Sequence, residues 1–233
     1  MRELSKRLYA IASLVDRGAI VADIGTDHGY LPIYLLEQGI CQKAIAMDIR
    51  LGPLERARTH IKEHNLSEYI ETRLSNGMKE LRENEADTVV LAGMGGRLML
   101  DILEAKKENP LLFYAYIMQP QSEVPLVRKC LQDKGYEIRA EKMVEEGGKY
   151  YPIIKARKGQ MNWEREIDFQ YGKFLLEEKD PVLYTYLQKQ REKVREIERK
   201  IKKRGQGSEE IHRRLLTLWE EKNRIKEALE SYE

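Results

Sequence analysis

The sequence predicts an α/β fold with a mostly parallel sheet, followed by a purely helical segment. Two observations support this prediction. Apolar runs alternate with helix-patterned stretches as far as Gly159, which is typical of repeated strand–helix units. After Gly159, glycines become rare and Lys, Arg, Glu, Leu and Ile dominate. The change of composition predicts one domain over residues 1–159 and a second over residues 160–233.

Seven strand-like runs and the helices between them account for the first domain. The runs cover 19–24, 43–48, 69–74, 86–92, 112–118, 135–144 and 150–157. The expected helices cover 4–15, 51–64 and 97–108, and another begins at Pro32. The short gap 145–149 indicates a hairpin, so the sheet should end with an antiparallel strand. Seven strands with this ending fit the Rossmann-like, methyltransferase form of the nucleotide-binding fold.

Apolar spacing predicts three helices in the second domain. The first covers 162–178, and Asp180-Pro181 begins the next as N-cap and first turn. Gly205 to Ser208 interrupts the pattern, and Ser208 can cap the last helix. Apolar residues step by four and three on both long helices, at Leu183, Leu187, Val194, Ile197 and Ile201, then at Ile211, Leu215, Leu218, Ile225 and Leu229.

The two series mirror each other about the glycine turn, and the polar Gln190 falls opposite Lys222. This match predicts an antiparallel coiled-coil hairpin within one chain. An intermolecular coiled coil is the main alternative, and a monomer is expected rather than a homodimer.

Composition excludes several classes of protein. The formal net charge is only +2, so the whole chain has no general affinity for polyanions. Cys41 and Cys130 match no metal or redox spacing, and the four histidines form no metal-ligand pattern. No apolar run approaches the length of a membrane span, and the N-terminus lacks the apolar stretch of a signal peptide. We therefore expect a cytoplasmic protein without a metal or a membrane segment.

The stretch from Val21 to Pro32 is the most informative motif. An apolar run ends in Asp23, a turn from Gly25 to Gly29 follows, and a helix then begins. Glycines let backbone N–H groups approach a ligand at the positive end of a helix. Asp48, at the end of the next run, is placed to accept hydrogen bonds from ribose hydroxyls. The loop is not G-x-G-x-x-G, so it favours S-adenosylmethionine over a dinucleotide.

Two later loops complete the predicted cofactor site. Asn76-Gly77 follows the third run, where an amide can recognise an adenine amino group, and Ala92 to Gly96 brings three glycines between methyl donor and acceptor. Simple turn geometry is the alternative for the first of these loops, and a flexible connector is the alternative for the second. The predicted cofactor-binding residues are Asp23, Gly25, Thr26, Asp27, His28, Gly29, Asp48, Ile49, Asn76, Gly77, Ala92 and Gly93.

Other residues are candidates for contact with the methyl acceptor. Gln119 ends the fifth run and either hydrogen-bonds a flipped base or orders its own loop. Between Lys189 and Arg204 nine Lys/Arg stand against three Glu, and Arg191, Arg195 and Arg199 share one helical stripe. This local excess favours RNA, although a solvated helix flank is a strong alternative.

Five motifs give the chain a resemblance to the bacterial tRNA (adenine-22-N1)-methyltransferase family. They are Leu4-Ser-Lys-Arg-Leu8, Asp23-Ile-Gly-Thr-Asp-His-Gly-Tyr-Leu-Pro32, Ala92-Gly-Met-Gly-Gly96, Gln119-Pro120 and Gly148-Lys-Tyr-Tyr-Pro152. The resemblance implies a class I methyltransferase that uses S-adenosylmethionine to methylate N1 of adenine 22 in the D-arm region of tRNA. It also implies a C-terminal coiled-coil arm.

This chemistry assigns expected roles to particular residues. Methylated adenine is cationic, so Asp27 is the candidate for stabilising the developing charge, with Gln119 as the second catalytic candidate. The expected substrate-binding residues are Arg7, Tyr30, Gly95, Arg191, Arg195 and Arg199. Two rival functions remain: a methyltransferase for another RNA or a small acceptor, and a non-catalytic RNA-binding protein with a retained nucleotide fold.

Overall fold

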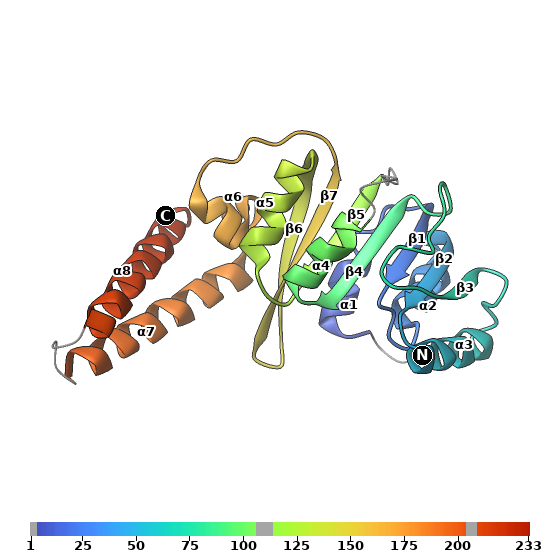
Figure 1. The fold of residues 1–233 in the computed structure, drawn as a ribbon, viewed down its shortest axis with the longest axis horizontal. Coiled ribbons are helices and arrows are strands. Elements are labelled where there is room, and N and C mark those ends of the chain that lie inside the picture. The colour runs from blue at the N-terminus through green and yellow to red at the C-terminus, as the bar shows by residue number, and fades with distance from the viewer. Residues whose placement is uncertain (1–3, 106–113, 204–208) are drawn as a thin grey trace. The chain divides into compact units, whose positions relative to one another are not determined.

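A computed structural model describes residues 4–105, 114–203 and 209–233 (Figure 1). The chain divides into two compact units, Met1–Asn162 and Trp163–Glu233. This boundary lies close to the composition change at Gly159. Among the described residues, no helix is both long enough and apolar enough to span a membrane.

The first unit is built on a seven-stranded sheet with the order β3-β2-β1-β4-β5-β7-β6. Its strands are β1 (Ala19–Ile24), β2 (Cys41–Asp48), β3 (Ile70–Leu74), β4 (Thr88–Met94), β5 (Ala115–Pro120), β6 (Tyr136–Glu146) and β7 (Lys149–Lys158). Strands β1 to β5 pair in parallel, whereas β7 is antiparallel to both β5 and β6. The predicted seven-stranded Rossmann-like sheet with an antiparallel end is confirmed.

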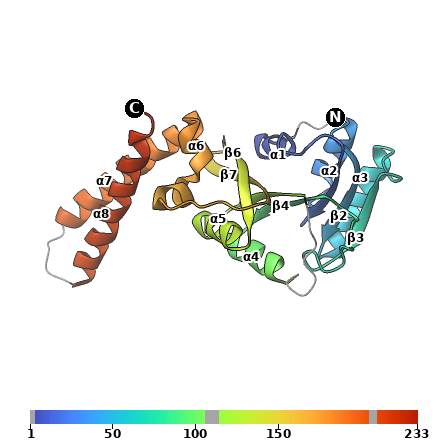
Figure 2. The same cartoon turned by 90° about the horizontal axis from the view of Figure 1, so that it is seen from above.

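Helices cover both faces of this sheet (Figure 2). Helices α1 to α3 lie on one face, and α4 and α5 lie on the other. Their bounds are α1 (Lys6–Ala12), α2 (Tyr30–Glu37), α3 (Leu51–Glu63), α4 (Gly96–Glu104) and α5 (Val124–Asp133). Because both faces are covered, the central strands are continuously apolar rather than alternating, as in β5, whose residues are all buried.

Each predicted helix of this unit has somewhat different bounds in the structure: α2 begins at Tyr30 rather than Pro32, and α3 ends at Glu63 rather than at residue 64. The larger differences concern α1, which also ends at Ala12 rather than at residue 15, and α4. Helix α1 begins at Lys6 instead of residue 4, because the Ser5 hydroxyl accepts a hydrogen bond from the backbone N–H of Leu8 at 3.2 Å and caps it. Helix α4 is described as far as Glu104, and the remainder of the predicted helix after residue 105 lies outside the described residues.

In the second unit, the helix predicted over 162–178 is wrong at its start. Helical backbone begins only at residue 166 and includes a π-helical turn, Asp168–Gly172, before α6 (Lys173–Glu177). Trp163 is buried, and its ring centre lies 5.7 Å from that of Phe169 and 6.4 Å from that of Phe174. Burial of the indole folds this segment back against the helix instead of extending it.

The two long helices of this unit, α7 (Pro181–Lys203) and α8 (Glu209–Glu230), lie side by side and run in opposite directions (Figures 1 and 2). Asp180 is the predicted N-cap: its carboxylate accepts from the N–H groups of Val182 and Leu183 at 2.9 and 2.8 Å. Across the pair, the Tyr232 hydroxyl donates to the carbonyl of Asp180 at 2.9 Å. The turn at 205–208, with its Ser208 cap, lies outside the described residues.

Five of the ten predicted seam residues are buried, and the other five are partly exposed. The fully buried members are Leu183, Leu187 and Val194 on α7, and Leu218 and Ile225 on α8. Of the two polar residues predicted to face each other, Gln190 and Lys222, the lysine forms an ion pair with Glu198 at 3.4 Å.

Candidate cofactor and acceptor site

A cavity of about 410 Å³ lies at the carboxyl ends of the parallel strands. Its position is the switch point of the sheet, where the strand order reverses between β1 and β4. Its volume falls within the usual range for small-molecule sites. The lining residues are Ile24, Gly25, Asp48, Ile49, Arg50, Ser75, Asn76, Gly77, Ala92, Gly93, Met94, Leu98 and Ile102.

The structure brings most of the predicted cofactor residues together here. Seven of them line the cavity: Gly25, Asp48, Ile49, Asn76, Gly77, Ala92 and Gly93. Asp23 and Thr26 are buried, while Asp27, His28 and Gly29 belong to the first loop but not to the lining. Six lining residues were not among the predicted site residues: Ile24, Arg50, Ser75, Met94, Leu98 and Ile102. Leu98 and Ile102 are one turn apart on α4, and that spacing was the available signal.

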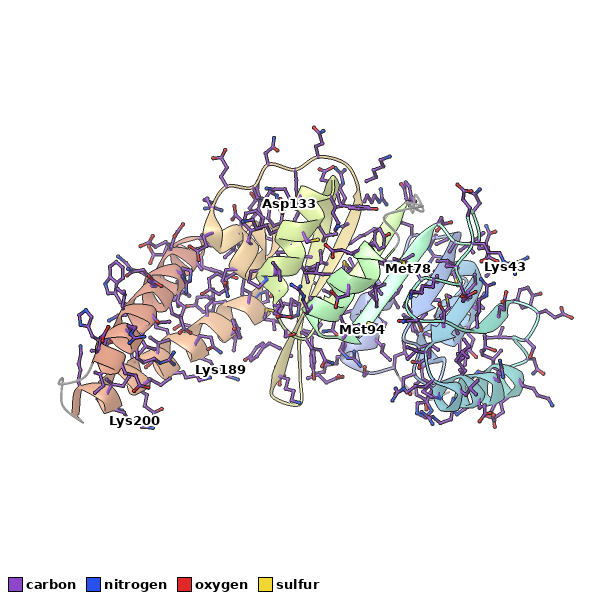
Figure 3. All side chains as sticks on the ribbon, in the orientation of Figure 1. Lys43, Met78, Met94, Asp133, Lys189 and Lys200 are labelled. Atoms are coloured by element: carbon purple, nitrogen blue, oxygen red, sulfur yellow. The ribbon has the colours of Figure 1, made fainter. Side chains whose placement is uncertain are left out.

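The first loop is held in a form that only glycine adopts easily. Gly25 has φ +78°, and both its N–H and that of Thr26 donate to the carbonyl of Met47, at 2.7 and 2.8 Å. A Cβ on Gly25 would lie 2.3 Å from the terminal methyl of Met94. Figure 3 shows Met94 close to the end of β4. The glycine therefore lets the loop and Met94 approach each other beside the cavity.

Asp48 is fixed in the cavity wall by its own turn. The carboxylate is buried, and its Oδ1 accepts from the backbone N–H of Arg50 at 2.8 Å. An oriented carboxylate at the end of the second strand suits the hydroxyls of a ribose.

Asp23 is a second buried carboxyl group near the cavity, and its pKa differs from the usual value. Burial raises the pKa of Asp23 to about 6; the Thr26 hydroxyl opposes this effect, and the negative charge of Asp48 adds to it. A folded-state pKa above the unfolded value stabilises the protein at low pH, and this stabilisation is lost as the pH rises through 6. We expect the ligand-free protein to lose about 3 kcal/mol from this group between pH 4 and 7.

Urea unfolding of the wild type and Asp23→Asn across that pH range measures the effect. The asparagine variant lacks the titration, so its advantage over the wild type should grow with pH and level off near pH 7. Parallel profiles for the two proteins would contradict the assignment.

Gln119 lies near the carboxyl end of β5, at the same edge of the sheet as the cavity, and is fully buried. Its Oε1 accepts two hydrogen bonds, from Nη1 of Arg7 at 2.9 Å and from the N–H of Gly93 at 3.1 Å. Its Nε2 donates to the carbonyl of Pro120 at 3.2 Å. These hydrogen bonds order the loop around Gln119, and its expected contact with a flipped base stays a prediction. Arg7 also lies over the ring of Tyr151, 5.7 Å from its centre.

Asp27 lies in the first loop but is largely exposed, at 75% of its side chain. It pairs with Nε2 of His28 at 3.3 Å and with Nη2 of Arg56 at 3.6 Å. Because it is not part of the cavity lining, its charge-stabilising role stays a prediction.

Tyr30 begins α2, and its ring is nearly parallel to two imidazoles. The ring centres of His28 and His60 each lie 5.2 Å from that of Tyr30. Gly95 precedes α4, and a Cβ there would meet the Ser122 hydroxyl at 3.3 Å. Neither residue lines the cofactor cavity.

The predicted basic stripe on α7 consists of exposed or half-buried arginines. Arg195 pairs with Glu192 at 2.9 Å, and Arg191 donates to Gln188 and lies 3.7 Å from Glu192. Lys189 and Lys200 lie on the same helix (Figure 3). In the described part of the chain, no group of three or more His, Cys, Asp or Glu side chains is arranged to hold a metal ion.

Comparison with known proteins agrees with this geometry. The methyltransferase-domain family matches residues 4–154. The tRNA (adenine(22)-N(1))-methyltransferase of Bacillus subtilis is 34% identical over 185 residues, which are 77% of this chain and 78% of that enzyme.

Two solved structures extend the similarity over both units. The Streptococcus pneumoniae protein Sp1610, in complex with S-adenosyl-L-methionine, is 37% identical, with a TM-score of 0.85 over 97% of this chain and 100% of that one. TrmK of M. capricolum, in complex with the cofactor product S-adenosyl-homocysteine, is 27% identical, with a TM-score of 0.84 over 98% of each chain. The chain belongs to the tRNA (adenine(22)-N(1))-methyltransferase family.

Proposed function

We propose that this protein transfers the methyl group of S-adenosylmethionine to N1 of adenine 22 in the D-arm region of tRNA. The observation that carries the proposal is the cavity at the switch point, lined by Gly25, Asp48 and Gly93 in a chain of this family. A tRNA substrate implies the cytoplasm as the working compartment.

The cavity residues fit this cofactor. Asp48 would accept from the ribose hydroxyls, and Asn76 with Gly77 would contact the adenine end. Gly25 and Gly93 both have positive φ, so their backbone can approach the ligand without side-chain interference. Asp23 is buried beside Thr26 of the first loop and would favour a cationic ligand once it is ionised. When bound, S-adenosylmethionine supplies an electrophilic sulfonium methyl group.

The protein needs no strong base for this reaction. N1 of adenine is neutral and has an in-plane lone pair, so positioning supplies most of the acceleration. The product base is cationic, and the candidate that would stabilise it is Asp27. An Asp27→Asn enzyme with normal ligand binding and full turnover would contradict that role.

The second unit is proposed to be a coiled-coil arm that contacts RNA phosphates. Leu187 and Val194 on α7 and Leu218 and Ile225 on α8 are buried at the predicted seam positions, so the apolar stripe is covered within one chain. This covering favours a monomer.

Neutralising Arg191, Arg195 and Arg199 together by glutamine should raise the KM for tRNA and flatten its dependence on salt. Each lost phosphate contact lowers the slope of log K against log salt by about 0.7 to 0.9, so the triple variant should lose roughly two to three units of slope. Binding of tRNA measured between low and moderate salt gives this slope directly.

The matched control replaces Lys43, Lys129 and Lys158 by glutamine, which removes the same charge from exposed positions in the first unit. An equal loss of slope in both variants would show a general charge effect and would contradict a specific role for the α7 stripe.

Methyl transfer from labelled S-adenosylmethionine to unmodified tRNA transcripts tests the function as a whole. We expect 1-methyladenosine at position 22, identified by mass spectrometry, and no transfer when that position is guanine. Cofactor binding without transfer to any tRNA would overturn the proposal.

A further inference from the structure

The side chain of Gln121 is exposed, whereas the polar side chains next to it in the sequence make hydrogen bonds. Gln121 follows β5, and its side chain has no hydrogen bond recorded within the described residues. The adjacent Ser122 hydroxyl accepts from the N–H of Gly96 at 3.3 Å, and Glu123 accepts from the N–H of Arg97 at 2.9 Å. Gln119 is buried and committed to Arg7 and Gly93.

Gln121 lies next to Gly93, which belongs to the loop expected between the methyl donor and the methyl acceptor. Its backbone N–H donates to the carbonyl of Met94 at 2.8 Å, which fixes its place after the strand. The position of a Cβ on Gly93 would be 3.8 Å from Nε2 of Gln121 and 3.1 Å from Nη1 of Arg7. Gly93 also lines the cofactor cavity. The amide of Gln121 is not part of the cavity lining, but it lies beside Gly93, which is.

We propose that Gln121 recognises the target adenine through its N6 amino group and N7, and so determines specificity for adenine. This inference rests on the proposed function. A carboxamide presents one acceptor and one donor side by side, which matches the N6 donor and the N7 acceptor of adenine in a bidentate pair. Guanine presents two acceptors, O6 and N7, on that edge and does not match.

The methylation chemistry favours recognition of adenine through N6 and N7 over recognition through N6 and N1. The same amide would also match the pairing edge of adenine, N6 and N1, but a hydrogen bond to N1 would occupy the lone pair that must receive the methyl group. Recognition through N6 and N7 leaves N1 free to face the cavity. Arg7, which is held by Gln119 and Tyr151, lies beside the same position as a fixed cation for the adjacent phosphate.

The experiment pairs a protein change with a single-atom change in the RNA. The wild type and Gln121→Ala are assayed on tRNA with adenine 22 and on tRNA with 7-deazaadenine 22, in which a C–H group replaces N7. On adenine, Gln121→Ala should lower kcat/KM roughly ten- to a hundredfold with unchanged cofactor affinity. The 7-deaza substitution should reduce the wild-type kcat/KM relative to the variant, so that the two changes together cost less than the product of their separate effects.

Gln42→Ala is the matched control, because Gln42 is an exposed glutamine at the start of β2, at the opposite edge of the sheet. It should follow the wild type on both substrates. Full activity of Gln121→Ala on adenine, or the same 7-deaza effect in the wild type and in Gln121→Ala, would overturn the role of Gln121 while the methylation of adenine 22 still stood. A wild type that fails to methylate adenine 22 would overturn the proposed function and this inference with it.

Discussion

Replacing Gly25 with alanine is expected to weaken the binding of S-adenosylmethionine by about tenfold or more. The backbone at this position has φ +78°, where an L side chain is strained by roughly 1 to 2 kcal/mol. The added Cβ would also displace the terminal methyl of Met94, which lines the same cavity. A binding titration of the ligand-free enzyme measures the Kd directly.

Gly39→Ala separates these two contributions. Gly39 also has a positive φ, +59°, but a Cβ there would meet nothing within 4 Å. This variant should lose stability through backbone strain and keep its affinity for the cofactor. If Gly25→Ala bound as tightly as the wild type, the first loop would not be the cofactor loop.

Removing Glu141 should have the largest effect on stability. Nε of Arg128, on α5, donates to Oε1 of Glu141, on β6, at 2.8 Å, and both side chains are almost entirely buried. Glu141→Leu would leave a guanidinium in the interior without its counter-charge, which should lower the free energy of unfolding by about 3 to 5 kcal/mol. The double variant Arg128→Met/Glu141→Leu should recover most of the loss, because it removes both charges.

The measurement must report on the first unit. Both tryptophans, Trp163 and Trp219, lie in the second unit, so tryptophan fluorescence would miss the change. Hydrogen exchange of the β6 amides gives the local free energy instead. As a control in the same unit, Asp101→Ala breaks the exposed ion pair with Arg97 on α4, 3.8 Å long, and should change stability by less than about 1 kcal/mol. Equal effects of the two changes would contradict the importance of burial.

The site residues that could be predicted from the sequence lie in short continuous motifs at the ends of strands. Gly25, Asp48 and Gly93 each lie within a residue of the end of a strand, and the carboxyl ends of parallel strands meet at one edge. The same local logic identified the strands, because buried parallel strands are continuous apolar runs.

What sequence missed depends on contacts between distant segments. Met94, at the end of β4, and Leu98, on α4, line the cavity through the way the glycine loop joins this strand to this helix. One of the two hydrogen bonds that Oε1 of Gln119 accepts comes from Arg7, which is 112 residues away in the sequence. The helix expected from residue 162 starts late because Trp163 is buried against rings further along the chain, an interaction that periodicity does not encode.

The hydrogen bonds that join Arg7, Gln119 and Gly93 also affect the order in which parts of the protein fold. The β4–β5 pairing shifts register between Ala92 and Met94, and the N–H of Gly93 bonds to the Gln119 side chain instead. The loop between donor and acceptor thus takes its final place only when the first helix, synthesised early, meets a strand synthesised much later. Arg7 and Gln119 are 112 residues apart in the sequence, so their hydrogen bond closes a long loop. This part of the cavity wall should therefore form late in folding, after the local contacts between neighbouring strands and helices.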